Sequence, residues 1–345
     1  MATTNIAGQR RQELIAGYSF VAPALLVLLV FLFIPMFFTL WMSFRDWSGI
    51  TPPTESNGVG LQWYGRLLVQ DNVRRTDFFN AFKNTFYYAL GVVPTQTILA
   101  LLLAVIANQQ LLRFKGFFRT TFYFPSITSS VAIGLIFLWI YQSGGILNQV
   151  IRALNPAYRN ISWMNDPSGI LHNLFALFGM TIRNAPPWLT QPQILGLTPW
   201  QWLSGPSVTM TALMMLVVWT TAGTMMLVFL AALQDIPRPL YEAASVDGAT
   251  GLQQFFSITV PMLRPTIFFV VTLGLIGTFQ VFDQMFVMTS GGPAGTTISL
   301  AYLIYRAGFN DSQMGLASAI SVLLFLIIFS ATLLQRRIFS DRAVA

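Results

Sequence analysis

The chain has 345 residues, of which 9% are charged and 54% are hydrophobic, and its formal net charge is +7. A soluble protein carries about 25% charged residues, so most of this surface must face lipid rather than water. The absence of Cys excludes disulfides and thiolate chemistry, and the single His, His172, argues against a multi-His metal centre or a Ser-His-Asp triad. The composition therefore predicts an integral membrane protein, and we expect no metal, no cofactor and no enzymatic activity of its own. Its positive charge is more typical of cytoplasmic Lys and Arg than of nucleic-acid binding.

Apolar runs long enough to cross about 30 Å of hydrocarbon occur repeatedly along the chain. They predict an all-α membrane protein whose six transmembrane helices span residues 17–44, 84–107, 117–141, 208–233, 265–288 and 314–334. Arg10 and Arg11 precede the first run, as in a signal peptide. The run is much longer than the roughly 7–15 apolar residues of such a signal, and no small-residue cleavage site ends it. We therefore interpret the first run as a retained signal-anchor.

The distribution of Lys and Arg predicts the orientation of the chain. With the N-terminus inside the cell, the cytoplasmic segments would be 1–16, 108–116, 234–264 and 335–345. Their Lys/Arg density is about twice that of the outer segments 45–83, 142–207 and 289–313. The positive-inside rule then places both termini in the cytoplasm, although Arg74 and Arg75 fall on the outer side.

The outer segment 142–207 is too long for an ordinary connection between spans. It is rich in Trp and Pro and contains two similar stretches, Ile161-Ser-Trp-Met-Asn-Asp-Pro and Ala185-Pro-Pro-Trp-Leu-Thr-Gln-Pro. Two interpretations remain open: an ordered cap on the outer face, or a docking surface for an extracytoplasmic partner. His172, which lies alone in this segment, is expected to be solvated or to cap a helix.

The segment 234–264 is predicted to form a helix–turn–helix in the cytoplasm. Pro237 and Pro239 would end the preceding span and start a new helix. Glu242 near that start would complement the positive end of the helix dipole. Gly248 permits the turn that follows.

The second helix of this segment is predicted at 252–258 and would present Phe255 and Phe256. Small side chains leave one face smooth enough for close approach by a groove of another protein. They are Ala243, Ala244, Ser245 and Ala249. The residues alone also fit an ordinary amphipathic connector between two spans.

One pattern in the segment is similar to a known family signature. Glu242-Ala-Ala, three residues, Gly248, nine residues, Ile258 and, after one residue, Val260-Pro261 resemble the EAA motif of binding-protein-dependent ABC importer permeases. Val260 stands where the family usually has Leu, and the core Asp247-Gly-Ala strengthens the match.

Other stretches resemble the carbohydrate-uptake branch of that family, whose members are similar to the maltose and glycerol-3-phosphate transporter permeases. These stretches are Ala81-Phe-Lys-Asn-Thr85, Gly116-Phe-Phe-Arg-Thr120, Phe124-Pro125, Thr289-Ser-Gly-Gly-Pro293 and Tyr302-Leu-Ile-Tyr305. The resemblance covers residues 17–337, but the outer segment 142–207 is longer than the branch usually carries. Asn84 and Thr85 are expected to cap the second helix.

The resemblance implies a type I ABC importer transmembrane domain with a long outer loop between helices 3 and 4. Its parts would be a cytoplasmic tail (1–16), a first helix (17–44), a domain with helices 2–6 and the coupling loop 234–264 (82–335), and a cytoplasmic tail (336–345). Such a multi-pass subunit would lie in the cell membrane of a prokaryote. Its implied partners are an ATPase subunit dimer, a second and distinct permease, and an extracytoplasmic solute-binding protein, with no nucleic acid.

The resemblance also implies that the segment 234–264 couples transport to ATP hydrolysis in a separate subunit. The residues implied in this coupling are Glu242, Ala243, Ala244, Asp247, Gly248, Ala249, Phe255 and Pro261. The chain contains no Gly-x-x-x-x-Gly-Lys-Ser/Thr motif, which agrees with a nucleotide site elsewhere. Closure of the ATPase dimer would rock the spans between outward- and inward-facing states.

Polar residues within the predicted spans are candidates for solute contact. Asp283 is ionisable and costly at membrane depth, and Gln280 lies three residues before it on the same predicted helix face. Asp283 could instead cap or pair within the bundle near the outer interface, and Thr220, Thr221 and Thr224 also fit helix packing. The resemblance implies that spans four and five line the solute path, with the candidates Thr221, Thr224, Thr278, Gln280 and Asp283.

Two other function classes fit the sequence less well. A secondary transporter would carry its own coupling-ion site and often inverted repeats, and neither is visible. A membrane-embedded enzyme such as a glycosyltransferase would need paired carboxylates or a metal site near the interface, and the sequence shows no such cluster. The expected function is therefore import of a sugar or, alternatively, of a non-sugar solute such as a polyol phosphate.

Overall fold

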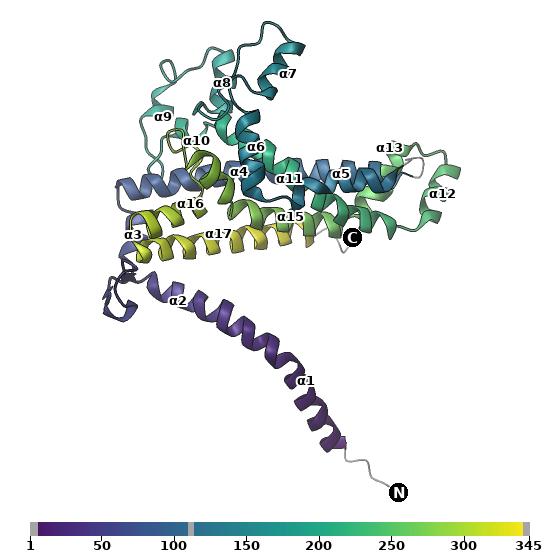
Figure 1. Ribbon diagram of the computed structural model, residues 1–345, viewed down its shortest axis with the longest axis horizontal. Coiled ribbons are helices and arrows are strands. Elements are labelled where there is room, and N and C mark those ends of the chain that lie inside the picture. Colours follow the sequence, from purple (N-terminus) through teal and green to yellow (C-terminus); the bar gives the residue numbers. More distant parts are fainter. Residues whose placement is uncertain (1–5, 110–113, 341–345) are drawn as a thin grey trace.

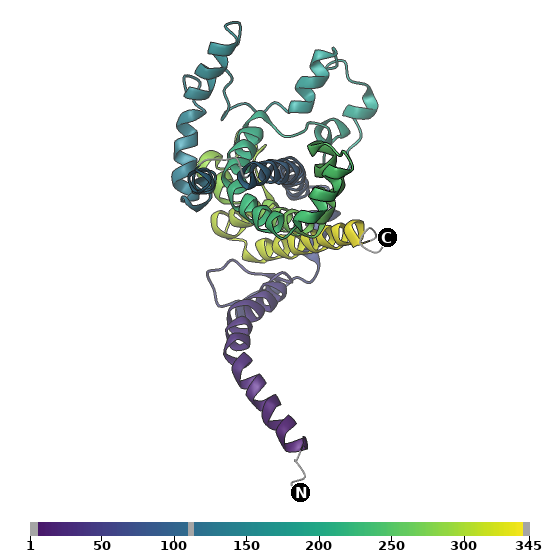
Figure 2. The ribbon, with the colours of Figure 1, turned by 90° about the vertical axis from the view of Figure 1, so that its right-hand side faces the viewer.

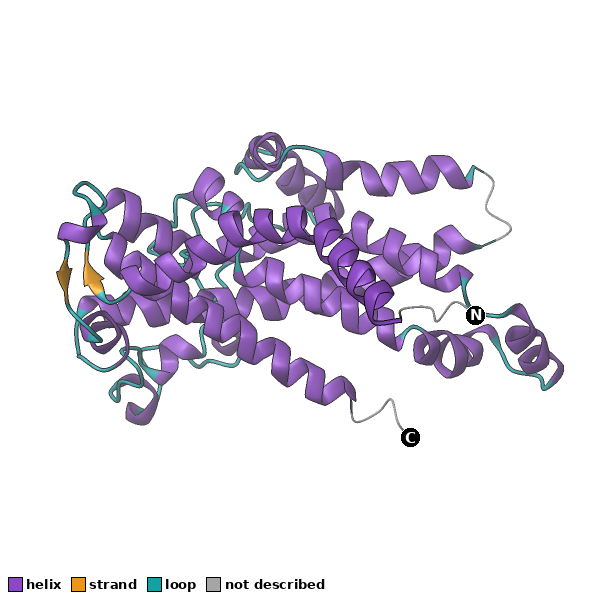
Figure 3. Ribbon diagram, turned by 90° about the horizontal axis from the view of Figure 1, so that it is seen from below, coloured by secondary structure: helices purple, strands orange, loops and turns teal. Residues whose placement is uncertain are grey.

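The computed structural model describes residues 6–109 and 114–340, and helices dominate this part of the chain (Figures 1 and 3). Its one small sheet is an antiparallel hairpin of β1 (Arg45–Asp46) and β2 (Asn57–Gly58). The outermost residues of both predicted tails and Arg113 of the predicted cytoplasmic segment 108–116 lie outside the described residues.

Four stretches are long and apolar enough to cross a membrane. They are Arg10–Met42, α4 (Val73–Asn108), α11 (Val208–Gln234) and Met314–Phe339 within α17 (Met314–Ser340). Two bent pairs of helices raise the number of candidate spans in the described residues to six. The prediction of an all-α membrane fold is therefore confirmed.

The first span projects away from the rest of the molecule (Figures 1 and 2). It consists of α1 (Ile6–Leu28), a π-helical turn η1 (Leu29–Phe33) and α2 (Ile34–Met42). Its apolar window has no buried residue, and α2 packs on α17. Lipid or another chain must cover the exposed part, because water would solvate so apolar a helix poorly.

The helix α4 forms the centre of the bundle and packs along both α11 and α15 (Arg264–Phe279). Three alanines spaced along α4, Ala100, Ala104 and Ala107, are fully buried against Met226 and Phe229 of α11. Small side chains on one helix let the backbones of two membrane helices approach closely. With 36 residues, α4 is about 54 Å long and extends beyond the hydrocarbon region.

The third span is not the single helix predicted for residues 117–141. It consists of α5 (Lys115–Ile127) and α6 (Ser130–Ile140), which meet at an angle of 97°. Thr128 and Ser129 have extended rather than helical backbone at the bend. The helix α6 therefore leaves the bundle axis, as Figure 1 shows.

The fifth span also differs from the prediction, which placed one helix over residues 265–288. The helix α15 ends at Phe279, and the residues just after it are not helical before the π-helical turn η4 (Met285–Thr289). Its 16 residues cover only about 24 Å. The hydroxyl of Ser299 donates to the carbonyl of Val281 (2.7 Å), which satisfies one backbone group that the break leaves free.

Shorter elements lie between the long helices, and they include all the helices of segment 142–207. They are η2 (Pro53–Glu55), α3 (Gln62–Leu68), α7 (Ile146–Leu154), α8 (Ile170–Leu177), α9 (Pro187–Thr190), α10 (Pro199–Trp202), α16 (Leu300–Tyr305) and η5 (Arg306–Asn310). Segment 142–207 thus contains four short helices.

Asn148 holds the first part of this outer segment together. Its side chain is 1% exposed, and its amide nitrogen lies within hydrogen-bond distance of three backbone carbonyls, the shortest contact being to Ile161 (2.9 Å). Its amide oxygen accepts from the hydroxyl of Tyr158 (2.9 Å) and from the indole of Trp163 (3.1 Å). The first of the two similar sequence stretches is thereby attached to α7.

Replacing Asn148 by Asp is expected to loosen this segment, because a carboxylate would face three carbonyls without a proton to donate. Each buried polar group left unpaired costs about 1–3 kcal/mol. Limited trypsin digestion should therefore cut faster at Arg152 and Arg159. The exposed neighbour Gln149, changed to Glu, is the matched control. Equal cleavage rates in the two variants would show that Asn148 does not hold the segment.

The sequence suggested that His172 is solvated or caps a helix, and the structure shows neither. Its ring stacks on Trp200 with centroids 4.4 Å apart, and its Nε2 donates to the carbonyl of the same residue (2.9 Å). Burial lowers the pKa of His172 below its usual 6.5; the bond to Trp200 opposes this and the nearby charge of Lys83 adds to it. The ring therefore fastens α8 to α10 in its neutral form.

The attachment of α8 to α10 is expected to weaken in acid. Because the folded pKa of His172 is depressed, its contribution is complete above about pH 6.5 and is lost as the pH falls toward the folded value, since the unfolded segment takes up the proton more readily. Trypsin cleavage at the exposed Arg183, measured relative to cleavage of an unstructured Arg-containing peptide at the same pH, should accelerate as the pH decreases from about 8 to 5. A His172→Gln variant should flatten that profile; an unchanged profile would contradict the assignment.

Candidate functional site

The two helix breaks meet beside a cavity in the middle of the bundle. The hydroxyl of Ser130, at the start of α6, donates to Oδ2 of Asp283 (2.9 Å), just after the break that follows α15. A cavity of about 350 Å³ lies beside this contact and is lined from α4, α11, α15 and the residues after the break. Irregular backbone at membrane depth occurs where it is covered by protein or lines a cavity.

A second cavity of about 250 Å³ adjoins the first and shares Thr221, Met225 and Gln284 with it. It is lined by the bend between α5 and α6 and by the polar step of α11. Its hydroxyl-bearing residues are Ser126, Thr128, Ser130, Thr220, Thr221 and Thr224. We refer to the two cavities together as the central cavity.

The five residues predicted for the solute path all line the central cavity. Thr221 lines both parts; Thr278, Gln280 and Asp283 line the larger part, and Thr224 lines the smaller.

The predicted helical spacing of Gln280 and Asp283 is wrong, however. Gln280 is the C-cap of α15, and a non-helical turn separates it from Asp283. The hydroxyl of Thr278 is occupied by its own helix, since it donates to the carbonyl of Gly274 (2.8 Å). Gln280 and Asp283 are therefore the more available of these three side chains.

Two polar residues of α4, Tyr88 and Gln96, also line this cavity and were not predicted from the sequence. Oε1 of Gln96 accepts from the hydroxyl of Thr221 (2.7 Å), which links α4 to α11 within the membrane. Gln96 could have been predicted by the reasoning applied to Asp283, because it places a polar amide inside the apolar run 84–107.

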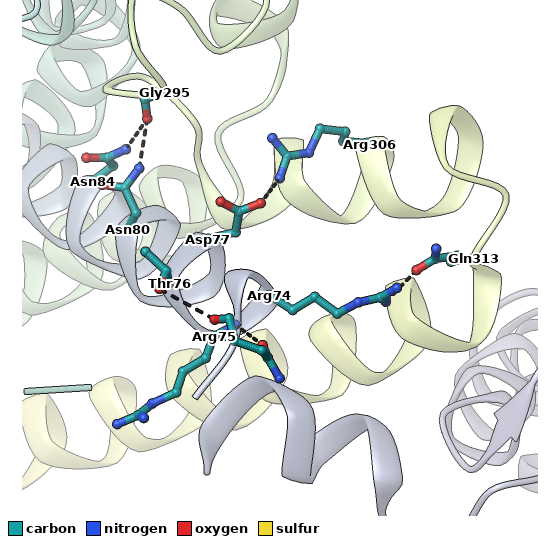
Figure 4. A network of polar contacts seen from close by, with 10 residues as sticks. Arg74, Arg75, Thr76, Asp77, Asn80, Asn84, Gly295, Arg306 and Gln313 are labelled. Atoms are coloured by element: carbon teal, nitrogen blue, oxygen red, sulfur yellow. Dashed lines mark hydrogen bonds and ion pairs between the residues drawn. The ribbon is translucent and has the colours of Figure 1, made fainter. Parts of the chain in front are cut away.

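A polar network holds the N-terminal end of α4 to the segment that follows η4 (Figure 4). Asn80 and Asn84 both donate to the carbonyl of Gly295 (3.1 and 2.9 Å). The prediction that Asn84 and its neighbour cap the second helix is wrong, because α4 begins at Val73 and its N-cap is Asn72. Asn84 instead fixes a loop that is distant in sequence.

Charged residues extend this network toward α17. Asp77 pairs with Arg306 at 2.6 Å, and Arg74 donates to Gln313 (Figure 4). Arg74 also lies over the ring of Trp63, 5.4 Å from its centroid. Arg74, which did not fit the Lys/Arg bias used to predict the orientation, thus makes specific contacts at this end of the molecule.

A helix pair lies at the end of the bundle away from the β-hairpin (Figure 1). It comprises α12 (Arg238–Val246), a turn, α13 (Gly251–Gln254) and the π-helical turn η3 (Phe255–Thr259), and α14 (Val260–Met262) leads from it to α15. The predicted helix–turn–helix is confirmed. We call residues 238–259 the helix pair.

Local contacts fix the geometry of the helix pair. Gly248 has a φ of +78° in the turn, and Thr250 forms a capping box with Gln253. The amide of Gln254 donates to the hydroxyl of Ser245 (2.9 Å) across the two helices. Hydroxyls of Tyr241 and Thr259 are 2.8 Å apart at the base of the pair. The turn therefore depends on one left-handed residue, which suits Gly.

The residues predicted to contact an ATPase differ in exposure. Exposed residues are Glu242, Ala243, Asp247 and Gly248, and the half-buried ones are Ala244, Ala249, Phe255 and Pro261. Phe256 rather than Phe255 is the exposed aromatic, because Phe255 lines a cavity of about 240 Å³ against the end of α4.

The predicted helix-dipole role of Glu242 is wrong. The residue lies beyond the first turn of α12, which contains no acidic residue. The helix dipole acts on charges only within the first and last turns of a helix. The exposed carboxylate of Glu242 is thus directed at the surroundings of the helix pair rather than used within it.

Comparisons with known proteins bear on this arrangement. The family described as "Binding-protein-dependent transport system inner membrane component" matches residues 161–342. The probable ABC transporter permease protein YurN of Bacillus subtilis is 31% identical over 95% of this chain and 97% of the relative. The lactose transport system permease protein LacF of Rhizobium radiobacter is 29% identical, with 97% of both chains covered.

The fold is shared with a solved structure. A crystal structure of a bacterial ABC transporter involved in the import of the acidic polysaccharide alginate aligns with a TM-score of 0.66 at 21% identity, covering 97% of both chains. The resemblance inferred from the EAA pattern is confirmed, and the fold is that of a type I importer transmembrane domain. The chain is a multi-pass membrane protein and belongs to the family of binding-protein-dependent transport system inner membrane components.

Proposed function

We propose that this permease subunit imports a sugar through the central cavity and that its helix pair couples the path to a separate ATPase. Related permeases are named for the transport of lactose, of trehalose and maltose, and of arabinooligosaccharides. Hydroxyl and amide side chains line the cavity, and these groups pair well with the hydroxyls of a sugar.

The coupling proposal depends mainly on the exposure of the helix pair. Three of its apolar side chains are largely uncovered: Val246 is 89% exposed, Leu252 68% and Phe256 62%. Clustered apolar side chains at a water-facing end of a membrane protein mark a surface that a partner covers. The EAA pattern from Glu242 to Gly248 lies within the same surface, and the chain has no nucleotide-binding motif of its own.

The proposed orientation of the chain in the membrane follows from this placement of the helix pair. The end with the helix pair would face the cytoplasm with both termini, and the end with the Figure 4 network would face the extracytoplasmic binding protein. Residues 82–335 would form the transporting domain in a prokaryotic cell membrane. A second, distinct permease would complete the path beside this chain.

Movement of the helix pair would be transmitted to the cavity through its junction with α15. The helices 251–262 and α15 meet at 67°, and the intervening Leu263 is 1% exposed. The hydroxyl contact between Tyr241 and Thr259 ties α12 to the same junction. Closure of the ATPase would therefore tilt α15 as a rigid element and change the break at its far end, where the cavity lies.

The proposal is tested by affinity purification of the tagged chain from membranes of its own host. An ATPase with a Gly-x-x-x-x-Gly-Lys-Ser/Thr motif and a second EAA-bearing permease should co-purify. A Glu242→Arg variant should lose most of the ATPase, whereas Ser257→Ala, also exposed on the helix pair, should retain it. A chain that purifies alone and transports solute without ATP would contradict the proposal.

A further inference from the structure

We infer that α4 supplies a solute-binding subsite, built from Tyr88 and Gln96, that selects an uncharged and hydroxyl-rich solute. The inference rests on the proposed function and adds to it the residues and the charge class of the solute. Both side chains line the larger part of the central cavity. They are eight residues apart, which places them about 12 Å from each other along one helix.

The hydroxyl of Tyr88 needs a partner. Tyr88 is 0% exposed, and its hydroxyl has no hydrogen-bond partner among the described residues. Buried hydroxyls in native proteins are nearly always paired, so an unpaired one beside a cavity points to a group that enters from outside the chain. A sugar hydroxyl can both donate to and accept from a phenol.

The amide of Gln96, in contrast, is oriented by a contact within the chain. Its oxygen lies 2.7 Å from the hydroxyl of Thr221, which is shared with the carbonyl of Val217 (2.7 Å), and this contact orients the side chain and leaves the NH₂ group as a donor. Gly274 of α15 makes room for this group, because a Cβ at that position would lie 2.4 Å from Nε2 of Gln96. The site therefore combines a held donor with an unpaired hydroxyl about 12 Å away along the helix.

Charge in the cavity excludes an anionic solute. Asp283 is the one acidic residue among the described residues that line the two parts, and no Lys, Arg or His lines either part. A uronate or a phosphate would lose its hydration beside a carboxylate with no cation in this chain's half of the path, which is strongly unfavourable. An uncharged sugar meets only hydroxyl, amide and aromatic groups there.

The test uses the complete importer with its binding protein in proteoliposomes. Lactose, maltose and arabinobiose serve as neutral probes, and glycerol 3-phosphate and a glucuronate disaccharide as anionic probes. Uptake should be confined to neutral probes. For the best probe, Tyr88→Phe and Gln96→Met should each raise KM about threefold to tenfold, the effect of losing one neutral hydrogen bond, with little change in maximal rate.

A deoxy-sugar series separates contact from packing. One monodeoxy analogue of the best probe should bind the wild type more weakly, yet bind Tyr88→Phe as well as the parent sugar does, because the lost hydroxyls face each other. Tyr87→Phe is the matched control, since the hydroxyl of Tyr87 donates to the carbonyl of Trp202 outside the cavity (2.7 Å). Its KM should not change.

Several results would overturn the inference. They are uptake of the anionic probes in preference to the neutral ones, unchanged KM values in both α4 variants, or a wild type that does not discriminate against any monodeoxy analogue. Failure of the proposed function looks different, because ATP would then drive uptake of none of the probes, and the inference would fall with it.

Discussion

Replacing Gly248 by Val is expected to abolish ATP-driven import while the protein still inserts in the membrane. Gly248 has a φ of +78°, and a side chain in the left-handed region costs about 1–2 kcal/mol, more when it is β-branched. No atom lies within 4 Å of a Cβ built at this position, so the substitution causes no clash within the chain. It would instead reshape the turn of the helix pair, and solute-stimulated ATPase activity should fall at least about tenfold.

Gly251→Ala is the matched control for this substitution. Gly251 is also exposed, also has nothing within 4 Å of its Cβ position, and starts α13 without a positive φ. This variant should import at the wild-type rate. If Gly248→Val imports solute with its ATPase at the normal rate, the assignment of the helix pair as the coupling element is wrong.

Replacing Gly223 by Ala is expected to destabilise the bundle itself. A Cβ at Gly223 of α11 would lie 2.2 Å from the carbonyl oxygen of Phe122 in α5, and that oxygen is backbone. The two helices would have to separate, at a cost of about 1–3 kcal/mol. Because Thr221 and Thr224 flank this contact at the central cavity, uptake should decrease together with the melting temperature in detergent.

Gly116→Ala provides the comparison for Gly223. It lies in α5 with nothing within 4 Å of its Cβ position, so the added methyl should leave the melting temperature unchanged or slightly higher. A Gly223→Ala protein as stable as this control would show that the close approach of α5 and α11 is not required.

The long apolar helices were predictable from the sequence because length and hydrophobicity alone define a span. The runs near 84–107, 208–233 and 314–334 all lie within helices of the structure. The break after Phe279 was not predictable, since the residues 280–282 are compatible with helix locally. Their conformation depends on Ser299, whose hydroxyl reaches Val281 from a distant part of the chain.

The bend in the third span has a similar explanation. Pro125 lies close to the bend and could have suggested it. Proline is tolerated in membrane helices, however, and α5 continues past Pro125 to Ile127. The extended pair Thr128 and Ser129 is not distinctive in sequence. Asn84 was misread for the same reason, because its partner Gly295 lies on a segment brought close only by the fold.

Of the two candidate sites, the helix pair was the more predictable. Its Pro, Gly and small residues determine a local turn, so a linear pattern describes it well. The central cavity combines residues from five helices, and the sequence identified Thr221 and Gln280 as polar groups in apolar runs that the family resemblance placed on the solute path. Tyr88 could not be recognised at all, because an aromatic residue in a span is ordinarily part of the core and only its unpaired hydroxyl distinguishes it.

The central claim is that this chain forms a sugar path powered by a separate ATPase. The most direct measurement is uptake of labelled lactose and maltose into proteoliposomes that contain the complex of this chain, the second permease and the ATPase, with the binding protein added outside. We expect uptake that requires ATP inside the vesicles and binding protein outside, and we expect Gly248→Val to abolish this uptake. Uptake that is driven by an ion gradient without ATP, or that this chain performs alone, would contradict it.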